Sequence, residues 1–156
     1  MPMNRLREYL DEHGTEYVIV SHSKAYTAQK IAASAHISGH QVAKSVILNV
    51  DGKMIMVVVP ASHRVNMNRL KRMLGAESVD LAREPKFQRL FPDCEVGAMP
   101  PFGNLYNLDV YVDRSLTEDD VIAFNACSHN ELVRMAYKDF EKLVNPHIID
   151  CTFEHV

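Results

Sequence analysis

The sequence predicts a mixed α+β fold, in which a largely antiparallel sheet curves into a half-barrel with helices around it. Two observations predict this class. The apolar runs 44–50 and 54–59 flank the pair Asp51-Gly52, and an Asp-Gly pair between β-branched runs favours a tight antiparallel hairpin. The other apolar runs are short and do not alternate regularly with helical segments, which argues against a doubly wound parallel sheet.

Each element follows from a local pattern of apolar residues and end signals. A first helix carries an apolar stripe and ends at Gly14. Asn66 is placed to cap a later helix that Gly75 ends, because asparagine favours helix starts and glycine favours helix ends. The remaining helices are predicted at 28–35 behind Thr27, at 85–90 and at 137–144, and the remaining strands at 17–20, 108–112, 121–124 and 132–135.

Length and composition limit the class of protein. The chain of 156 residues is expected to be one domain, 1–156, with a peripheral tail at 145–156. Its apolar fraction of 47% and charged fraction of 24% are ordinary for a soluble protein. No apolar stretch approaches the ~20 residues of a membrane helix. The charged N-terminal segment does not resemble a signal peptide, so we expect no membrane partner and a cytoplasmic location.

The cysteines and the net charge indicate which cellular compartment and which partners to expect. Cys94, Cys127 and Cys151 show no paired spacing, which favours thiols in a reducing cytoplasm over a disulfide framework. The net charge of −3 argues against nonspecific binding of duplex DNA, so a nucleic-acid partner would have to meet a local basic patch. One run without acidic residues is either a solvated helix face or a docking place for the phosphates of a nucleic acid, and its cations are Arg64, Arg69, Lys71 and Arg72.

Lys44 stands out because it begins a strand on an apolar face. Side chains alternate along a strand, so Lys44 shares a face with Val46, Leu48 and Val50. Charged side chains are seldom fully buried unless they are paired. The ammonium group therefore either extends to water along its aliphatic stem or meets an anionic or carbonyl-bearing ligand.

Two further stretches carry more polar chemistry than structure requires. The loop 97–103 reads GAMPPFG, and two adjacent prolines make a stiff backbone that is suited to gripping a small ligand or simply to connecting two elements. The segment 125–130 reads NACSHN and places His129 between two apolar strands, as a proton donor or acceptor or as part of an ordinary turn. Ser128 and His129 do not form a nucleophile–base pair, because neighbours on an extended chain point apart.

No metal and no cofactor are expected. His147, Cys151 and His155 are spaced by four residues, which would align them on a helix. The β-branched and aromatic residues between them make a poor helix, and a structural zinc site needs four ligands.

Together these features match, in order, the YbaK family of free-standing aminoacyl-tRNA deacylases, which are relatives of the editing domain of bacterial prolyl-tRNA synthetases. The chain resembles that family from about Tyr17 to Val144. The matching segments are GHQVAKS (39–45), DGK (51–53), VPASHRV (59–65), LGA (74–76), GAMPPFG (97–103), VYVD (110–113) and NACSH (125–129).

The resemblance implies a YbaK-like fold and hydrolysis of the ester that joins a wrong, small amino acid to a tRNA, proline tRNA first. It places the family's key lysine at Lys44 and its site histidine at His129, the two residues expected to be catalytic. Lys44 could orient the ester carbonyl or the terminal phosphate, and a ribose hydroxyl beside the ester could help to activate water. The implied partners are aminoacylated tRNA and prolyl-tRNA synthetase. The residues expected to bind substrate are Ser45, Gly97, Ala98, Met99, Pro100, Pro101, Phe102, Gly103, Asn125, Cys127 and Ser128.

Two positions depart from the family pattern. Ser45 stands where members more often carry threonine or asparagine, and Cys127 stands where glycine is common. If that glycine provides a positive φ or a close approach to ligand, Cys127 strains or narrows the site. Two other functions remain open: a non-catalytic module that binds an RNA end or a nucleotide, and a small-molecule hydrolase that uses Cys127 or His129.

Overall fold

The computed structural model describes residues 4–21, 42–83, 89, 91–92, 94, 98–128 and 131–154. Its helices are α1 (Asn4–Glu12), α3 (Met67–Leu74) and α5 (Tyr137–Val144), with short 3-10 helices η1 (Gly103–Tyr106) and η2 (Arg114–Glu118). Its strands are β1 (Tyr17–Ser21), β2 (Ala43–Val50), β3 (Lys53–Pro60), β4 (His63–Val65), β5 (Val79–Leu81), β6 (Asp109–Asp113), β7 (Val121–Asn125), β8 (Glu131–Ala136), β9 (His147–Ile149) and β10 (Thr152–Glu154). The helix predicted at 28–35 lies outside the described residues, as does nearly all of the one predicted at 85–90.

The predicted hairpin is confirmed. β2 pairs antiparallel with β3 from Ala43 opposite Pro60 to Val50 opposite Lys53, which leaves a two-residue turn. Both turn residues have positive φ, 50° at Asp51 and 86° at Gly52. This turn matches the right-handed twist of the strands, which is why the Asp-Gly pair predicts it.

The strands form a mixed α+β architecture with mainly antiparallel pairing. A five-stranded sheet has the order β5-β2-β3-β6-β9, in which the β3–β6 and β6–β9 pairs are parallel. A second, antiparallel sheet has the order β1-β8-β7, and β10 pairs with β4. A parallel bridge between Val42 and Ala123 connects the first two sheets. A single curved half-barrel stays a prediction, because the described strands are divided among three sheets.

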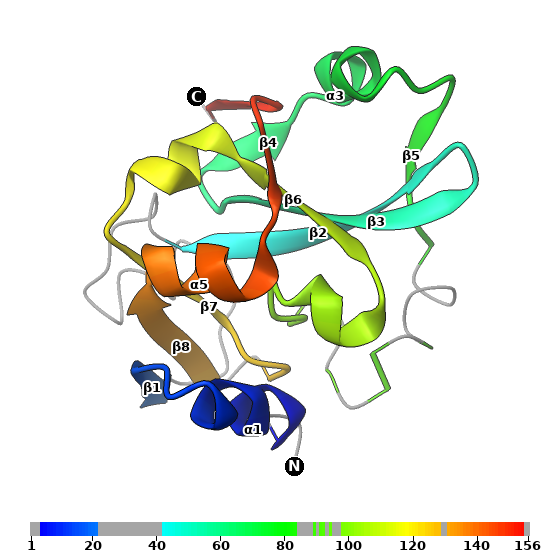
Figure 1. Ribbon diagram of the computed structural model, residues 1–156. Helices are drawn as coiled ribbons and strands as arrows, with labels where there is room; N and C mark the ends of the chain where they lie inside the picture. Colours follow the sequence, from blue (N-terminus) through cyan, green and yellow to red (C-terminus); the bar gives the residue numbers. More distant parts are fainter. Residues whose placement is uncertain are drawn as a thin grey trace.

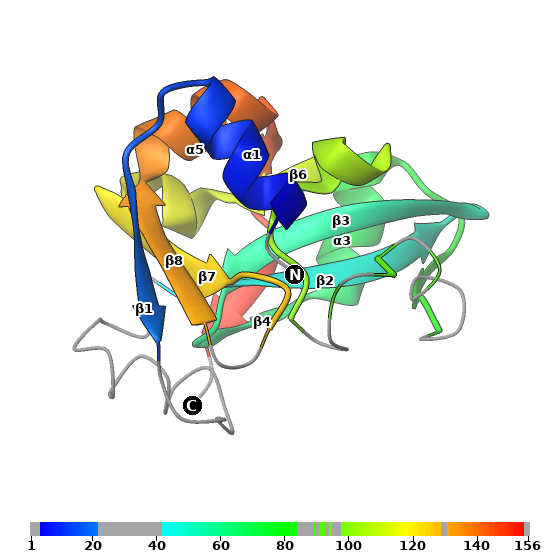
Figure 2. The ribbon, with the colours of Figure 1, turned by 90° about the horizontal axis from the view of Figure 1, so that it is seen from below.

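The helices cover opposite ends of the molecule. Figure 1 shows α3 at one end and α1 at the other, with the five-stranded sheet between them. Figure 2 shows α1 beside α5, where the Tyr9 hydroxyl donates to the Leu143 carbonyl at 3.1 Å. The predicted caps of α3 are confirmed: the Asn66 side chain accepts from the Arg69 N–H, and Gly75 is left-handed with φ 62°. None of the helices in the described ranges is long and apolar enough to cross a membrane.

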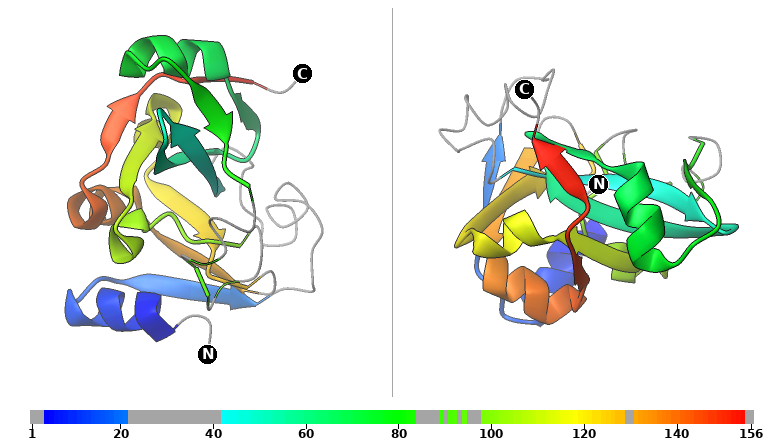
Figure 3. Two further views of the ribbon diagram at one scale, coloured as in Figure 1. Left: turned by 90° about the vertical axis from the view of Figure 1, so that its right-hand side faces the viewer. Right: turned by 90° about the horizontal axis from the view of Figure 1, so that it is seen from above.

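Part of the C-terminal tail packs into the core, where Ile149, Cys151 and Thr152 are buried, and this corrects the expectation of a peripheral tail. β9 adds to the five-stranded sheet and β10 pairs with β4, so the tail runs from α5 toward α3 (Figure 3). Cys151 between them is 0% exposed, and its carbonyl accepts from the Asn66 N–H at 2.7 Å. Strands of three residues are too short to show an alternating pattern, so the sequence gives no sign of them.

Candidate functional site

β2 packs against a core cluster on each of its two faces, and this decides to which side Lys44 and Ser45 point. Ala43 and Ile47 belong to the main core cluster, which contains the aromatic rings of the molecule's centre. Leu48 belongs to a second cluster beneath α3. Because faces alternate along a strand, Ser45 lies on the side of the main core and Lys44 lies on the opposite side.

The Lys44 side chain lies in a shallow groove of about 280 Å³. The groove is formed by β2, β4, α3 and β5, and its apolar wall includes the exposed Leu81. Burial of the ammonium group and the nearby Arg64 guanidinium hold the pKa of Lys44 below its usual value. Two cations beside an apolar wall suit an anion attached to an apolar body. The remaining lining residues are Val46, Val65 and Met67.

The start of β2 and the end of β7 meet at one place. The parallel bridge joins Val42 to Ala123, and two residues further along each chain lie Lys44 and Asn125. Extended chain rises about 3.3 Å per residue, so both residues lie within about 7 Å of the bridge along their strands. Segments that are 81 residues apart in sequence, as 42 and 123 are, are therefore brought together at the predicted site.

The proline loop is held rigidly against this place. Ala98 and Phe102 are 0% exposed, and the residues between them are also buried. The Phe102 ring packs against Phe124 and Phe140 at centroid distances of 5.6 Å, so its side chain serves the core. A Cβ on Gly103 would lie 2.8 Å from Val110 Cγ2, so this glycine is needed for close packing against β6. The residues from Ala98 to Pro101 are buried as well, and the Ala98 carbonyl already accepts a hydrogen bond from the Cys127 N–H.

Two polar atoms near the meeting point are buried and lack a hydrogen-bond partner within the described ranges. They are Ser45 Oγ and Asn125 Oδ1. A buried polar group without a partner costs about 1–3 kcal/mol, so such groups usually serve a ligand or a bound water. Both residues belong to the predicted substrate-binding set.

The turn after β7 is attached to the proline loop by its backbone. The Cys127 N–H donates to the Ala98 carbonyl at 2.8 Å, and the Ala126 N–H donates to the Glu131 carbonyl at 3.3 Å. Cys127 has φ 67°, the left-handed conformation that glycine adopts most easily. The substitution of the family's glycine therefore falls at a position that requires a positive φ.

The expectation of unpaired cysteine thiols is wrong for two of the three. Cys94 and Cys127 form a disulfide, with their Cα atoms 4.1 Å apart, and only Cys151 is a free thiol. The two are 33 residues apart in sequence, so no short spacing could reveal them; the turn and the segment before the proline loop meet only in the folded chain. In this state Cys127 has no thiolate, which removes it as a catalytic nucleophile.

Two predicted site residues, Gly97 and His129, lie outside the described residues. Of the proline loop, none of the described residues 98–103 lines the groove of Lys44. Of the basic run, Arg69 forms an ion pair with Asp150 at 3.2 Å, whereas Lys71 and Arg72 are exposed on α3. A larger depression of about 600 Å³ between α1, β1, β8 and α5 contains no predicted site residue.

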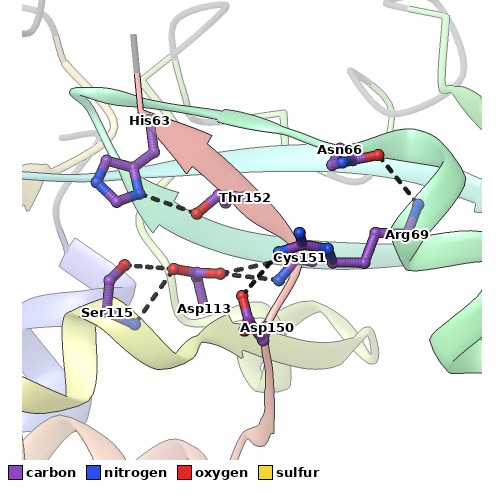
Figure 4. A network of polar contacts seen from close by, with 8 residues as sticks. All are labelled: His63, Asn66, Arg69, Asp113, Ser115, Asp150, Cys151 and Thr152. Atoms are coloured by element: carbon purple, nitrogen blue, oxygen red, sulfur yellow. Dashed lines mark hydrogen bonds and ion pairs between the residues drawn. The ribbon is translucent and has the colours of Figure 1, made fainter.

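A buried polar network that the sequence did not indicate anchors the tail (Figure 4). Asp113 is 2% exposed and accepts hydrogen bonds from the Cys151 N–H at 3.0 Å and from both the N–H and the hydroxyl of Ser115. Burial alone would raise the pKa of Asp113, but the hydrogen bonds from Ser115, Cys151 and Thr152 bring it below its usual value. Burial and the Asp113 charge raise the pKa of the Cys151 thiol to about 12.

His63 also belongs to this network, and the metal-site spacing that the sequence offered in this region is not realised on a helix. His63 Nδ1 lies 2.9 Å from the Thr152 hydroxyl. His147 and Cys151 lie on and just after β9 rather than on a helix. Within the described ranges, no group of three or more histidine, cysteine or acidic residues is arranged to hold a metal ion.

Comparison with known proteins shows the family of this chain. The model of the aminoacyl-tRNA editing domain family matches residues 22–143. The proline–tRNA ligase of Bacillus mycoides (strain KBAB4) is 29% identical over 117 residues, which cover 75% of this chain and 19% of the ligase. The ligase of Bacillus cytotoxicus is 30% identical over 120 residues, 77% of this chain and 20% of the ligase. The chain thus spans about a fifth of these curated relatives.

Solved structures show the same fold. A candidate trans-editing enzyme for prolyl-tRNA synthetase superposes with a TM-score of 0.85 at 19% identity, covering 97% of each chain. A hypothetical protein gives a TM-score of 0.85 at 23% identity, covering 96% of this chain and 100% of the other. With the family model spanning most of its length, the chain belongs to the aminoacyl-tRNA editing domain family.

Proposed function

We propose that this protein is a trans-acting aminoacyl-tRNA deacylase, which hydrolyses the ester between a tRNA and a wrong, small amino acid. The observation that carries the proposal is the position of Lys44, whose ammonium lies in a groove beside Arg64 and two residues from the bridge that brings in Asn125. Proline tRNA is the first substrate to test, because the curated relatives are proline–tRNA ligases. Prolyl-tRNA synthetase is the partner that would release such a substrate, and the cytoplasm is where both would occur.

Lys44 and Ser45 contact different parts of the substrate in this proposal. They point to opposite sides of β2, so one pocket wall cannot present both. Lys44 lies with a second cation, Arg64, whose charge disfavours the protonated lysine, and a phosphate relieves that repulsion better than a neutral ester carbonyl does. We therefore assign Lys44 to the phosphate of the terminal nucleotide, with the sugar or base against the apolar wall of the groove.

The aminoacyl end is assigned to the other polar groups at the meeting point. Ser45 Oγ and Asn125 Oδ1 need partners, and an α-amino group or a water molecule would supply them. The fixed backbone from Ala98 to Pro101 limits the size of the side chain that can enter. Hydrophobic pockets discriminate one methylene group by only about 1–3 kcal/mol, so this limit selects small amino acids as a class.

The reaction itself requires little from the protein. Water attacks the carbonyl carbon of the ester, the single bond between that carbon and the ribose oxygen breaks, and the ribose oxygen takes a proton from the water, so that the free amino acid and the ribose hydroxyl are the products. Holding the ester and the water in contact provides most of the acceleration, since positioning can lower a barrier by several kcal/mol. The ribose hydroxyl beside the ester is proposed to activate the water. Hydrolysis of a tRNA ending in 2′-deoxyadenosine at the normal rate would eliminate that step.

The test is deacylation of proline tRNA charged with alanine, cysteine, serine or threonine. We expect Lys44→Ala to lower kcat/KM by about 100-fold on at least one substrate that the wild type hydrolyses, as is common for a lost charged contact to a substrate. Lys53→Ala is the matched control, because Lys53 is an exposed lysine on β3 that pairs with Asp109 at 2.8 Å and lies outside the site.

Two outcomes would redirect the proposal. A wild-type protein that binds the tRNA end but hydrolyses none of the four esters is a binding module rather than an enzyme. Equal loss of activity in Lys44→Ala and Lys53→Ala would remove Lys44 from the site.

A further inference from the structure

Cys127 adopts a backbone conformation that its side chain disfavours. Four residues other than glycine have positive φ in the described ranges, and three of them are Asp51, Asn107 and Asn145. Aspartate and asparagine tolerate the left-handed region because their short polar side chains can bond locally. Cys127, with φ 67°, is the exception, and something must hold it there.

Two bonds hold Cys127 in place. Its N–H donates to the Ala98 carbonyl at 2.8 Å, and its sulfur is joined to Cys94. Cys94 is itself fixed in a turn, since its N–H donates to the Phe91 carbonyl at 3.1 Å. The disulfide therefore connects the turn that follows Asn125 and contains Ser128 to Cys94, which precedes the proline loop in sequence.

The two sulfurs differ in access. Cys127 is 1% exposed, whereas Cys94 is only partly buried. A small oxidant or reductant therefore reaches Cys94 first. The third cysteine, Cys151, is 0% exposed and has a pKa of about 12, so it does not take part.

We propose that Cys94 and Cys127 form a redox modification site that controls the order of the substrate-binding turn. The reactant is a low-molecular-weight disulfide such as glutathione disulfide. The Cys94 thiolate attacks it and releases one glutathione, and Cys127 then displaces the second glutathione, leaving the protein disulfide and two reduced glutathione molecules. The functional consequence rests on the deacylase activity proposed above.

The backbone conformation of Cys127 determines which redox state favours substrate binding. In the oxidised protein the disulfide holds Cys127 in the left-handed region and preserves its bond to Ala98. In the reduced protein the Cβ of Cys127 favours a return to negative φ, so the turn loses its fixed position and substrate binding weakens. For a residue with a Cβ, the left-handed conformation costs about 1–2 kcal/mol, which shifts the equilibrium between the ordered and the displaced turn about tenfold. We expect the KM to rise by about that factor.

The first experiment needs neither a substrate nor a variant. The wild type is equilibrated in oxidised and in reduced glutathione, thiols are counted, and hydrogen exchange of the peptide containing residues 126–128 is measured. We expect two additional thiols and faster exchange of the Cys127 amide after reduction. Unchanged exchange after the disulfide has opened, or no disulfide under oxidising conditions, would overturn the proposal.

The second experiment links the site to activity. Cys94→Ser should match the reduced wild type in both buffers, with a raised KM for mischarged proline tRNA. Adding Cys127→Gly to Cys94→Ser should lower that KM again, because glycine adopts the left-handed conformation without a disulfide. Cys151→Ser is the matched control and should keep the redox response of the wild type.

The outcomes separate the two proposals. A KM that follows the redox state in the wild type but not in Cys94→Ser supports the redox site and its role in deacylation. A KM that is independent of redox state, while exchange responds, contradicts the functional consequence. A protein without deacylase activity in either buffer, whose exchange still responds, refutes the proposed function and leaves a redox site that orders the turn.

Discussion

Replacing Asp113 with asparagine should detach the C-terminal tail from the core. The carboxylate accepts from the Cys151 N–H at 3.0 Å, from the Ser115 N–H at 3.2 Å and from the Ser115 hydroxyl, while it is 2% exposed. Asparagine has one acceptor oxygen, so its amide group must face donors on the other side. If its oxygen keeps the two Ser115 hydrogen bonds, the hydrogen bond from the Cys151 N–H is lost, and the loss of a hydrogen bond to a charged acceptor lowers the free energy of unfolding by about 1.5–3 kcal/mol.

The effect should depend on pH in a defined direction. The hydrogen bonds hold the folded-state pKa of Asp113 below its usual value, whereas the unfolded carboxyl titrates near about 3.9. The carboxylate therefore stabilises the fold above about pH 4, and this stabilisation disappears as the pH falls through the folded-state pKa. The difference between wild type and Asp113→Asn should be constant near neutral pH and shrink in acid.

Urea unfolding followed by circular dichroism gives the free energy of unfolding of each variant. Repeating it from about pH 7 down to about pH 3 gives the pH dependence of the difference between them. Asp150→Asn is the matched control, because Asp150 is a neighbouring acid whose ion pair with Arg69 is exposed, with side chains 61% and 41% accessible. Exposed pairs contribute about 0.2–1 kcal/mol. If the two variants lose equal stability at neutral pH, the Asp113 network does not hold the tail and the reasoning fails.

Three further outcomes are expected. Gly103→Ala should lower stability by about 1–3 kcal/mol, because the new Cβ would lie 2.8 Å from Val110 Cγ2 in a packed core; a calorimetric Tm equal to that of wild type would show that β6 moves aside at no cost. Asn66→Ala should cost about 1 kcal/mol in denaturant unfolding, because its side chain accepts an N–H of the first turn of α3 at 3.0 Å; no loss would mean that water replaces the cap. Reversing the charges of Lys71 and Arg72 should raise the KM for mischarged tRNA at about 50 mM salt and make its further rise toward about 200 mM salt shallower than in wild type, because fewer phosphate contacts release fewer counterions; a KM and a salt dependence equal to those of wild type would exclude α3 from tRNA binding.

The local elements were predictable because short-range physics decides them. The Asp51-Gly52 turn needs positive φ at two adjacent residues, and the ends of α3 need an acceptor at Asn66 and a left-handed residue at Gly75. Phe102 shows the opposite case. Its position in a proline loop suggested ligand contact, but three aromatic neighbours from distant segments bury it completely.

By itself, the sequence determined the hairpin that carries Lys44, the family, and the unusual residue Cys127 where glycine is common. The tertiary structure decided which face of β2 each neighbour uses, which distant cysteine joins Cys127, and that the tail packs through Asp113 into the core. The physical reason is the distance along the chain over which each interaction acts. Turn and cap preferences act over a few residues, whereas the burial, charge and sulfur contacts that shape the site join segments as far apart as Val42 and Ala123.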